Sequence, residues 1–88
     1  MTDGLTVLYE KCEVHRYFEE VRHLVADAIR ELYRFNPELV SNLRVEHIDR
    51  AIYKYLQASR KRVINNSLQY FKACIMSSLR EYDIDRQN

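Results

Sequence analysis

The chain has 88 residues, of which 47% are hydrophobic and 31% are charged, and its formal net charge is +1. Compact domains run from about 50 to 250 residues, so this length predicts a single domain, residues 1–88, and excludes a two-domain enzyme. The chain holds one Gly and one Pro, which disfavours β-hairpins and glycine-rich phosphate loops because these need glycine at positive φ. The composition therefore predicts an all-α fold.

Localisation is inferred from features that the chain lacks. No apolar run approaches the roughly 18 residues of a membrane span, and residues 1–8 have neither the basic flank nor the apolar core of a signal peptide. The two cysteines, Cys12 and Cys74, are too few for a disulfide framework. We therefore expect a cytoplasmic protein with no membrane partner, whose cysteines are reduced and lie in the core.

The first two predicted elements differ in how clearly they are patterned. In residues 1–15 two patterns of apolar residues overlap. Helical spacing is shown by Leu5, Leu8, Tyr9 and Cys12, whereas the alternation typical of an extended segment is shown by Leu5, Val7 and Tyr9. This segment is either a short helix or a loosely packed arm, and an arm could pair two copies into a homodimer. Residues 17–35 form an amphipathic helix with an i, i+3, i+4, i+7 period, carried by Phe18, Val21, Leu24, Val25, Ala28, Ile29 and Leu32.

Asn36 and Pro37 mark the end of that helix, because the residue before proline is disfavoured in helical conformation. Proline is tolerated at a first helical position, so we expect residues 37–42 to form one short helical turn. The helical period then returns in a helix over about residues 46–59, with the stripe Ile48, Ala51, Ile52, Tyr55 and Leu56.

The last connection and the last helix complete the predicted fold. Residues 59–66 are expected to form a loop anchored by Val63 and Ile64, and Asn66 is expected to cap a helix that runs to about residue 82. The stripe of this helix is Leu68, Phe71, Ile75 and Leu79. Amphipathic helices joined by short connections bury their stripes together, so we expect a compact bundle of three main helices plus one or two short helices.

Charge is divided unevenly along the chain. Residues 1–43 hold five basic and eight acidic side chains, residues 44–80 hold eight basic and two acidic, and residues 81–88 hold one basic and three acidic. Residues 44–80, which we call the basic half, therefore carry a net charge of +6. A segregated positive region indicates an anionic partner such as DNA.

The candidate nucleic-acid-binding residues all lie in the basic half: Arg50, Lys54, Arg60, Lys61, Arg62, Lys72, Tyr53 and Tyr70. The triplet 60–62 lies in the expected loop before a helix N-terminus, whose backbone N–H groups attract anions. Tyr53 and Tyr70 lie among the cations, where their rings could stack on unpaired bases. The alternatives are half-buried tyrosines on a solvated face, or a protein-binding surface, where tyrosine is also common.

Patterns for catalysis and metal binding are weak or absent. The sequence has no glycine-rich phosphate loop and no nucleophile elbow, and its adjacent carboxylates would point apart on a helix. A metal site would have to combine Cys12, His15 and His23 with the distant His47 and Cys74, whereas structural zinc normally has paired ligands on each side. We therefore expect no enzyme activity, no cofactor and no metal site, with the histidines at the surface or as helix caps.

The last predicted helix carries a family resemblance. Residues 64–76, INNSLQYFKACIM, resemble the closing helix of DnaD-like replication proteins, whose pattern positions are filled by Tyr70, Phe71, Cys74 and Ile75. The similarity covers about residues 43–80 and extends to the C-terminal domains of replication initiators from Gram-positive plasmids and integrative elements. Ser78 stands where that pattern commonly has Trp, and the chain has no counterpart of the family's winged-helix module.

The resemblance and the charge together give our leading hypothesis. It is a non-catalytic DnaD-like module in replication initiation of a plasmid, phage or mobile element. The module would bind DNA non-specifically through residues 44–80, dock a replisome protein such as primase or a helicase loader, or do both. The competing hypothesis is a small mobile-element or phage protein that inhibits or regulates a host nucleoprotein through a charged helical face, with the acidic helix 17–35 as its surface.

Overall fold

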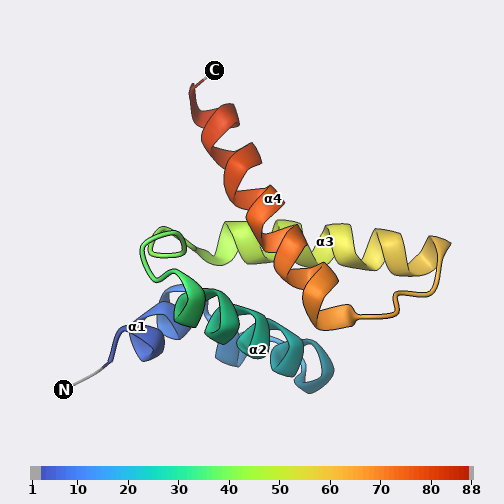
Figure 1. The fold of residues 1–88 in the computed structure, drawn as a ribbon, viewed down its shortest axis with the longest axis horizontal. Coiled ribbons are helices and arrows are strands. Elements are labelled where there is room, and N and C mark those ends of the chain that lie inside the picture. The colour runs from blue at the N-terminus through green and yellow to red at the C-terminus, as the bar shows by residue number, and fades with distance from the viewer. Residues whose placement is uncertain (1–2, 88) are drawn as a thin grey trace.

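The computed structural model describes residues 3–87, which fold into four α-helices and one short 3₁₀ helix (Figure 1). In chain order these are α1 (Gly4–Lys11), the 3₁₀ helix η1 (Val14–Arg16), α2 (Glu19–Phe35), α3 (Val45–Lys61) and α4 (Ser67–Gln87). No strand occurs within the described range. The predicted all-α bundle of three main helices plus one or two short helices is therefore confirmed.

The other helices are arranged around α4. Figure 1 shows α4 crossing α3, with the N-terminal end of α4 near α2, and α1 lies against α2. The buried stripe of α4 consists of Phe71, Ile75 and Leu79. The Phe71 ring is 1% exposed and meets the Tyr55 ring of α3 edge to face, with 5.8 Å between centroids. Burial of a side chain of this size stabilises the fold by about 1.5–3 kcal/mol, so this stripe holds α2 and α3 together.

The core continues from α4 into the other helices and the turns between α2 and α3. Its remaining fully buried apolar residues include Val25, Ala28, Ile29, Val40, Leu43, Ile48 and Ala51. The radius of gyration is 12.7 Å, close to the roughly 12 Å expected of a compact domain of this length. Among the helices of residues 3–87, none combines the length and apolarity that crossing a membrane requires.

The N-terminal segment forms a packed helix, so the alternative of a loose arm is wrong for residues 3–11. The Asp3 carboxylate caps α1 by accepting a hydrogen bond from the Thr6 N–H at 2.7 Å. The Tyr9 hydroxyl donates to the carbonyl of Ala26 in α2 at 3.0 Å, and Leu8 is buried. These contacts fix α1 on the surface of α2.

Three predicted boundaries differ from the structure. Residues 37–42 form consecutive turns with i to i+3 hydrogen bonds rather than a helical turn. α3 continues to Lys61 instead of ending near residue 59, because its last residues are good helix formers and no Gly or Pro interrupts them. α4 likewise continues past residue 82 to Gln87, whereas its predicted cap is confirmed by the Gln69 N–H, which donates to Asn66 Oδ1 at 3.0 Å.

Three residues expected to be buried are exposed. Phe18 is 83% exposed because it precedes the first turn of α2 in a non-helical conformation and so lies outside the helical period. Leu56, which belongs to the predicted stripe of α3, is 44% exposed. Val63 is also 83% exposed, which leaves the partly buried Ile64 as the apolar anchor of the α3 to α4 connection. The errors at Phe18 and Val63 arise where a side chain lies just beyond the end of a helix, whereas Leu56 lies within α3.

Truncation of Phe71 tests the central position of α4. Phe71→Ala should lower the free energy of unfolding by about 3–5 kcal/mol, because it removes a buried ring and leaves a cavity. Urea denaturation followed by circular dichroism measures this change. Phe18→Ala is the matched control, since it removes the same atoms from an exposed position and should cost less than about 0.5 kcal/mol. Similar losses for both variants would contradict the placement of α4.

Candidate nucleic-acid interface

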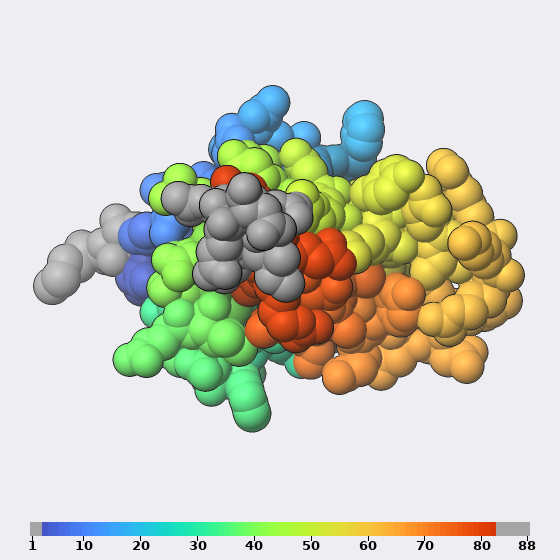
Figure 2. Space-filling view, turned by 90° about the horizontal axis from the view of Figure 1, so that it is seen from above, coloured from blue at the N-terminus to red at the C-terminus, as the bar shows by residue number. Residues whose placement is uncertain are grey.

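A groove lies between α3 and α4 at the end of the molecule where these helices are connected. Figure 2 shows this end in yellow and orange, with the two helices side by side. The groove, which we call the α3–α4 groove, has a volume of about 720 Å³. Its lining residues are Tyr53, Lys54, Gln57, Ala58, Lys61, Arg62, Tyr70, Ala73, Cys74, Ser77 and Arg80.

Helical spacing explains why these side chains meet. Lys54 and Lys61 are seven residues apart on α3, so they project from the same face. On α4, Tyr70 and Ser77 are also seven residues apart, and Arg80 follows three residues later. The packing of α3 on α4 then brings these two faces together, so that residues far apart in the chain share one groove.

The lining of the α3–α4 groove is positively charged. Four cationic side chains contribute to it, those of Lys54, Lys61, Arg62 and Arg80, and none of its described lining residues carries a carboxylate. Charges of one sign lining a cleft focus the electrostatic potential and raise the local concentration of oppositely charged ligands. The groove is therefore suited to an anion.

Two tyrosines contribute to the groove in different ways. Tyr53 is 63% exposed, so its ring is accessible to a stacking partner. Tyr70 is partly buried, and the Arg62 guanidinium lies over its ring, 5.0 Å from the centroid, in a cation–π contact. The Tyr70 ring lies 6.2 Å from that of Tyr55, whose hydroxyl donates to Ser67 Oγ at 2.8 Å. Tyr70 therefore positions Arg62, whereas Tyr53 is available to a ligand.

Glu81 lies beside the groove and engages two of the predicted phosphate-binding residues. Lys54 Nζ donates to Glu81 Oε1 at 2.5 Å, and Arg50 Nη1 lies 3.7 Å from Glu81 Oε2. The Ser77 hydroxyl also donates to Glu81 Oε1, at 3.2 Å. The hydrogen bond from Lys54 is the main cause that lowers the pKa of the Glu81 carboxyl below its ordinary value. A phosphate would have to compete with this carboxylate for both cations.

Three predicted residues are not part of the groove lining: Arg50, which Glu81 engages beside the groove, Lys72 and Arg60. Lys72 projects toward α2, where its Nζ donates to Glu31 Oε1 at 3.0 Å. Arg60 is exposed in the last turn of α3, next to Lys61, but is not part of the lining. The triplet 60–62 is therefore the C-terminal end of a helix rather than a loop, and cations there interact favourably with the helix dipole.

Arg80 is the cationic lining residue that sequence reasoning missed. It belongs to the basic half, but it is absent from the predicted site because it follows the triplet by almost twenty residues. Its spacing of three from Ser77 and seven from Ala73 is the signal that places it on the groove face. That signal becomes informative only when the face of α4 that packing leaves uncovered is known.

The two cysteines lie in the core, and one of the three histidines caps a helix. Cys12 and Cys74 are free and buried, as predicted, and burial raises the pKa of Cys12 to about 12 and raises that of Cys74 as well. Buried thiols that stay protonated at neutral pH are poor nucleophiles. His47 Nδ1 accepts a hydrogen bond from the Arg44 N–H at 3.0 Å, which is the predicted capping role, and the other two histidines are exposed.

No protein-family model matches the sequence, and neither a curated protein nor a solved structure matches it. The resemblance to DnaD-like proteins therefore stays a prediction. Within the described part of the chain, no group of three or more His, Cys, Asp or Glu side chains is arranged to hold a metal ion.

The Lys54–Glu81 contact predicts that the pKa of the Glu81 carboxyl changes when Lys54 is replaced. Lys54→Met should raise the pKa of Glu81 toward its ordinary value, which carbon NMR of the carboxyl group measures. A carboxyl with a lowered folded-state pKa adds stability above its unfolded pKa and loses it as the pH falls through the folded pKa. The stability advantage of the unaltered chain over Lys54→Met should therefore shrink as the pH falls below about 4.5. Lys61→Met is the control, and an unchanged Glu81 pKa in Lys54→Met would contradict the contact.

Proposed function

We propose that the protein binds DNA through the α3–α4 groove, without sequence specificity and with a preference for unpaired strands, as a non-catalytic module in replication initiation. The observation that carries this proposal is the convergence of four cations and two tyrosines on one groove whose described lining contains no carboxylate. Cations that track a phosphate backbone beside an exposed aromatic ring are the usual means of binding single strands.

Each part of the groove has a distinct role in this proposal. Lys61, Arg62 and Arg80 contact phosphates, since no acidic partner of these three is found among the described residues. Tyr53 stacks on a base. Phosphates and ring faces occur at every nucleotide, so these contacts give affinity with little sequence preference. Neutralising three or four phosphates of a single strand gives a log–log salt slope of about −2 to −3.

The family resemblance supports a role in replication. Two of its four pattern residues, Tyr70 and Cys74, line the groove, whereas Phe71 is core. Ser78, which stands where the family pattern has Trp, is fully buried and donates from its hydroxyl to the Cys74 carbonyl at 2.8 Å. The position at which the chain differs from the family pattern is therefore a core position and not part of the groove lining. The groove itself is the basis of the proposal.

The competing surface, the acidic helix 17–35, has less unpaired charge than its sequence indicated. Two of its four carboxylates form ion pairs within the molecule: Asp27 with Arg30 at 2.8 Å and Glu31 with Lys72 at 3.0 Å. Glu19 Oε1 lies 3.6 Å from His23 Nε2. A helix with half of its carboxylates already paired to cations offers less attraction to a basic protein partner than its sequence indicated. This observation favours DNA binding over the inhibition of a host nucleoprotein through that helix.

Removing the groove cations should weaken DNA binding and flatten its salt dependence. We expect Lys61→Ala, Arg62→Ala and Arg80→Ala together to reduce the magnitude of the log–log slope by about 2, since about 0.7 is lost per single-strand phosphate contact. Fluorescence anisotropy of a labelled oligonucleotide at several salt concentrations measures both quantities. The control removes three cations outside the groove, Arg16, Arg30 and Arg34. Equal losses in the control would show that binding is not localised to the α3–α4 groove.

Tyr53 provides a separate test of the strand preference. Tyr53→Ala should weaken single-strand binding by about 1–3 kcal/mol through loss of stacking, and it should weaken duplex binding much less because paired bases are not accessible. Tyr53→Phe should retain the affinity, because it keeps the ring and removes only the hydroxyl. If Tyr53→Ala left single-strand affinity unchanged, Tyr53 would have no stacking role.

A further inference from the structure

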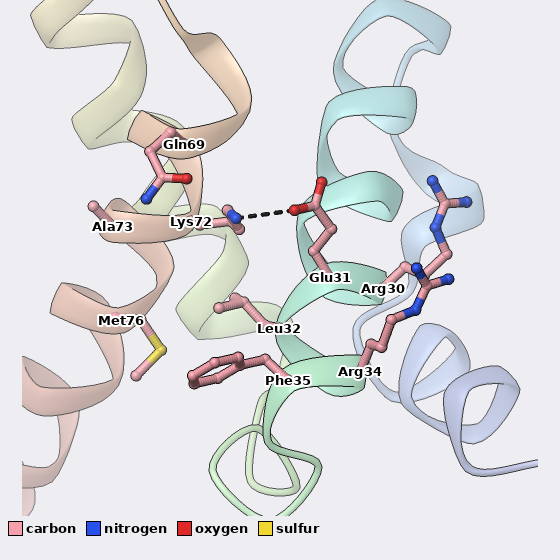
Figure 3. Close-up of a pocket in the computed structure, with 9 residues that line it drawn as sticks. All are labelled: Arg30, Glu31, Leu32, Arg34, Phe35, Gln69, Lys72, Ala73 and Met76. Atoms are coloured by element: carbon pink, nitrogen blue, oxygen red, sulfur yellow. Dashed lines mark hydrogen bonds and ion pairs between the residues drawn. The ribbon is translucent and has the colours of Figure 1, made fainter.

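A second groove lies between α2 and α4, with a volume of about 1030 Å³. Figure 3 shows that Leu32 and Phe35 extend from α2 toward α4, and that Met76 faces them from α4. Phe35 is 88% exposed at the last residue of α2. A large aromatic ring left exposed at the edge of a groove marks an interaction surface, because burying it there would remove much apolar area from water.

Charged groups surround this apolar strip, and their arrangement differs from that of the α3–α4 groove. Arg30 and Arg34 also contribute to the lining, and Figure 3 shows both extending from the side of α2 away from α4. Arg30 pairs with Asp27, whereas no acidic partner of Arg34 is found among the described residues. On the α4 side, Lys72 is bound to Glu31, which lies within the groove.

These observations favour a protein segment over nucleic acid. The Glu31 carboxylate lies inside the groove, where it would repel a strand with a phosphate at every nucleotide, whereas an amphipathic helix can direct its apolar face into the groove and its carboxylates outward. The exposed Phe35 and Met76 offer the adaptable apolar contact that protein-binding grooves use.

We propose that the α2–α4 groove binds an acidic amphipathic helix of a partner protein, with Phe35 as the apolar anchor and Arg34 as the charged contact. An amphipathic helix presents apolar side chains at i, i+4 and i+7, and these can contact Leu32, Phe35 and Met76 of the groove. Carboxylates beside that stripe reach the arginines on the outer side of α2. The inference is independent of DNA binding, because Phe35, Arg34 and Leu32 take no part in the α3–α4 groove.

The experiment uses a labelled synthetic peptide as the probe. It is about 15 residues long, has leucine at i, i+4 and i+7 positions flanked by glutamate, and is titrated with the whole chain in fluorescence anisotropy. A second peptide has the same composition in an order that breaks the apolar stripe. We expect the first peptide to bind at least about tenfold more tightly than the second, since a disrupted stripe loses its anchor contact.

Variants of the chain locate the binding. Phe35→Ala should weaken binding of the first peptide at least about tenfold, as truncation of an anchor does. Adding Arg34→Glu should weaken the binding further at low salt. Phe18→Ala is the matched control, because Phe18 is 83% exposed at the other end of α2 and outside the groove. Both phenylalanines are exposed, so neither truncation should unfold the chain.

Several results would overturn the proposal. Equal affinity of the chain for the two peptides would show that charge alone accounts for binding. Unchanged peptide affinity in Phe35→Ala would place the peptide outside this groove. Displacement of the peptide by a single-stranded oligonucleotide would indicate that the two ligands share a groove. A dimer in sedimentation velocity that Phe35→Ala dissociates would assign the surface to a second copy of the chain.

Discussion

The fold depends on one contact, the burial of the apolar stripe of α4 against both α2 and α3. Phe71, Ile75 and Leu79 supply that stripe, and α4 is the only main helix of the described structure that packs extensively on both of the others. A single stripe cannot cover two neighbouring helices completely, so space remains along each flank of α4. The α3–α4 groove and the α2–α4 groove occupy that space. Both candidate sites therefore share α4 as a wall and would be lost together if α4 were displaced.

Carboxylates give the two grooves different chemistry. Glu81 engages Lys54 beside the first groove, yet three further cations contribute to that lining without a carboxylate among them. Glu31 lies within the second groove and holds Lys72, and an exposed Phe35 stands next to it. The surplus of positive charge in residues 44–80 thus does not form one continuous surface. Part of it is neutralised by partners on other helices, and the remainder is concentrated at the α3–α4 groove.

Sequence periodicity was sufficient to predict α2, α3 and α4, because each has a long stripe and few breaking residues. It was insufficient where local patterns fit two structures: a basic triplet at 60–62 suits both a loop and a helix end. It also could not reveal the pairing of Lys72 with Glu31, residues 41 positions apart whose contact depends on how α4 crosses α2. For the same reason Arg80 was missed, since only the packed structure shows which face of α4 stays open.

The most direct test of the central claim is an amide NMR titration of the chain with a single-stranded oligonucleotide at low and at high salt. The account predicts that chemical shift changes concentrate on the α3–α4 groove, around Tyr53, Lys61, Arg62 and Arg80, and that they diminish when salt is added. Absence of changes at low salt in the folded protein would contradict it. Changes confined to the α2–α4 groove would contradict it as well.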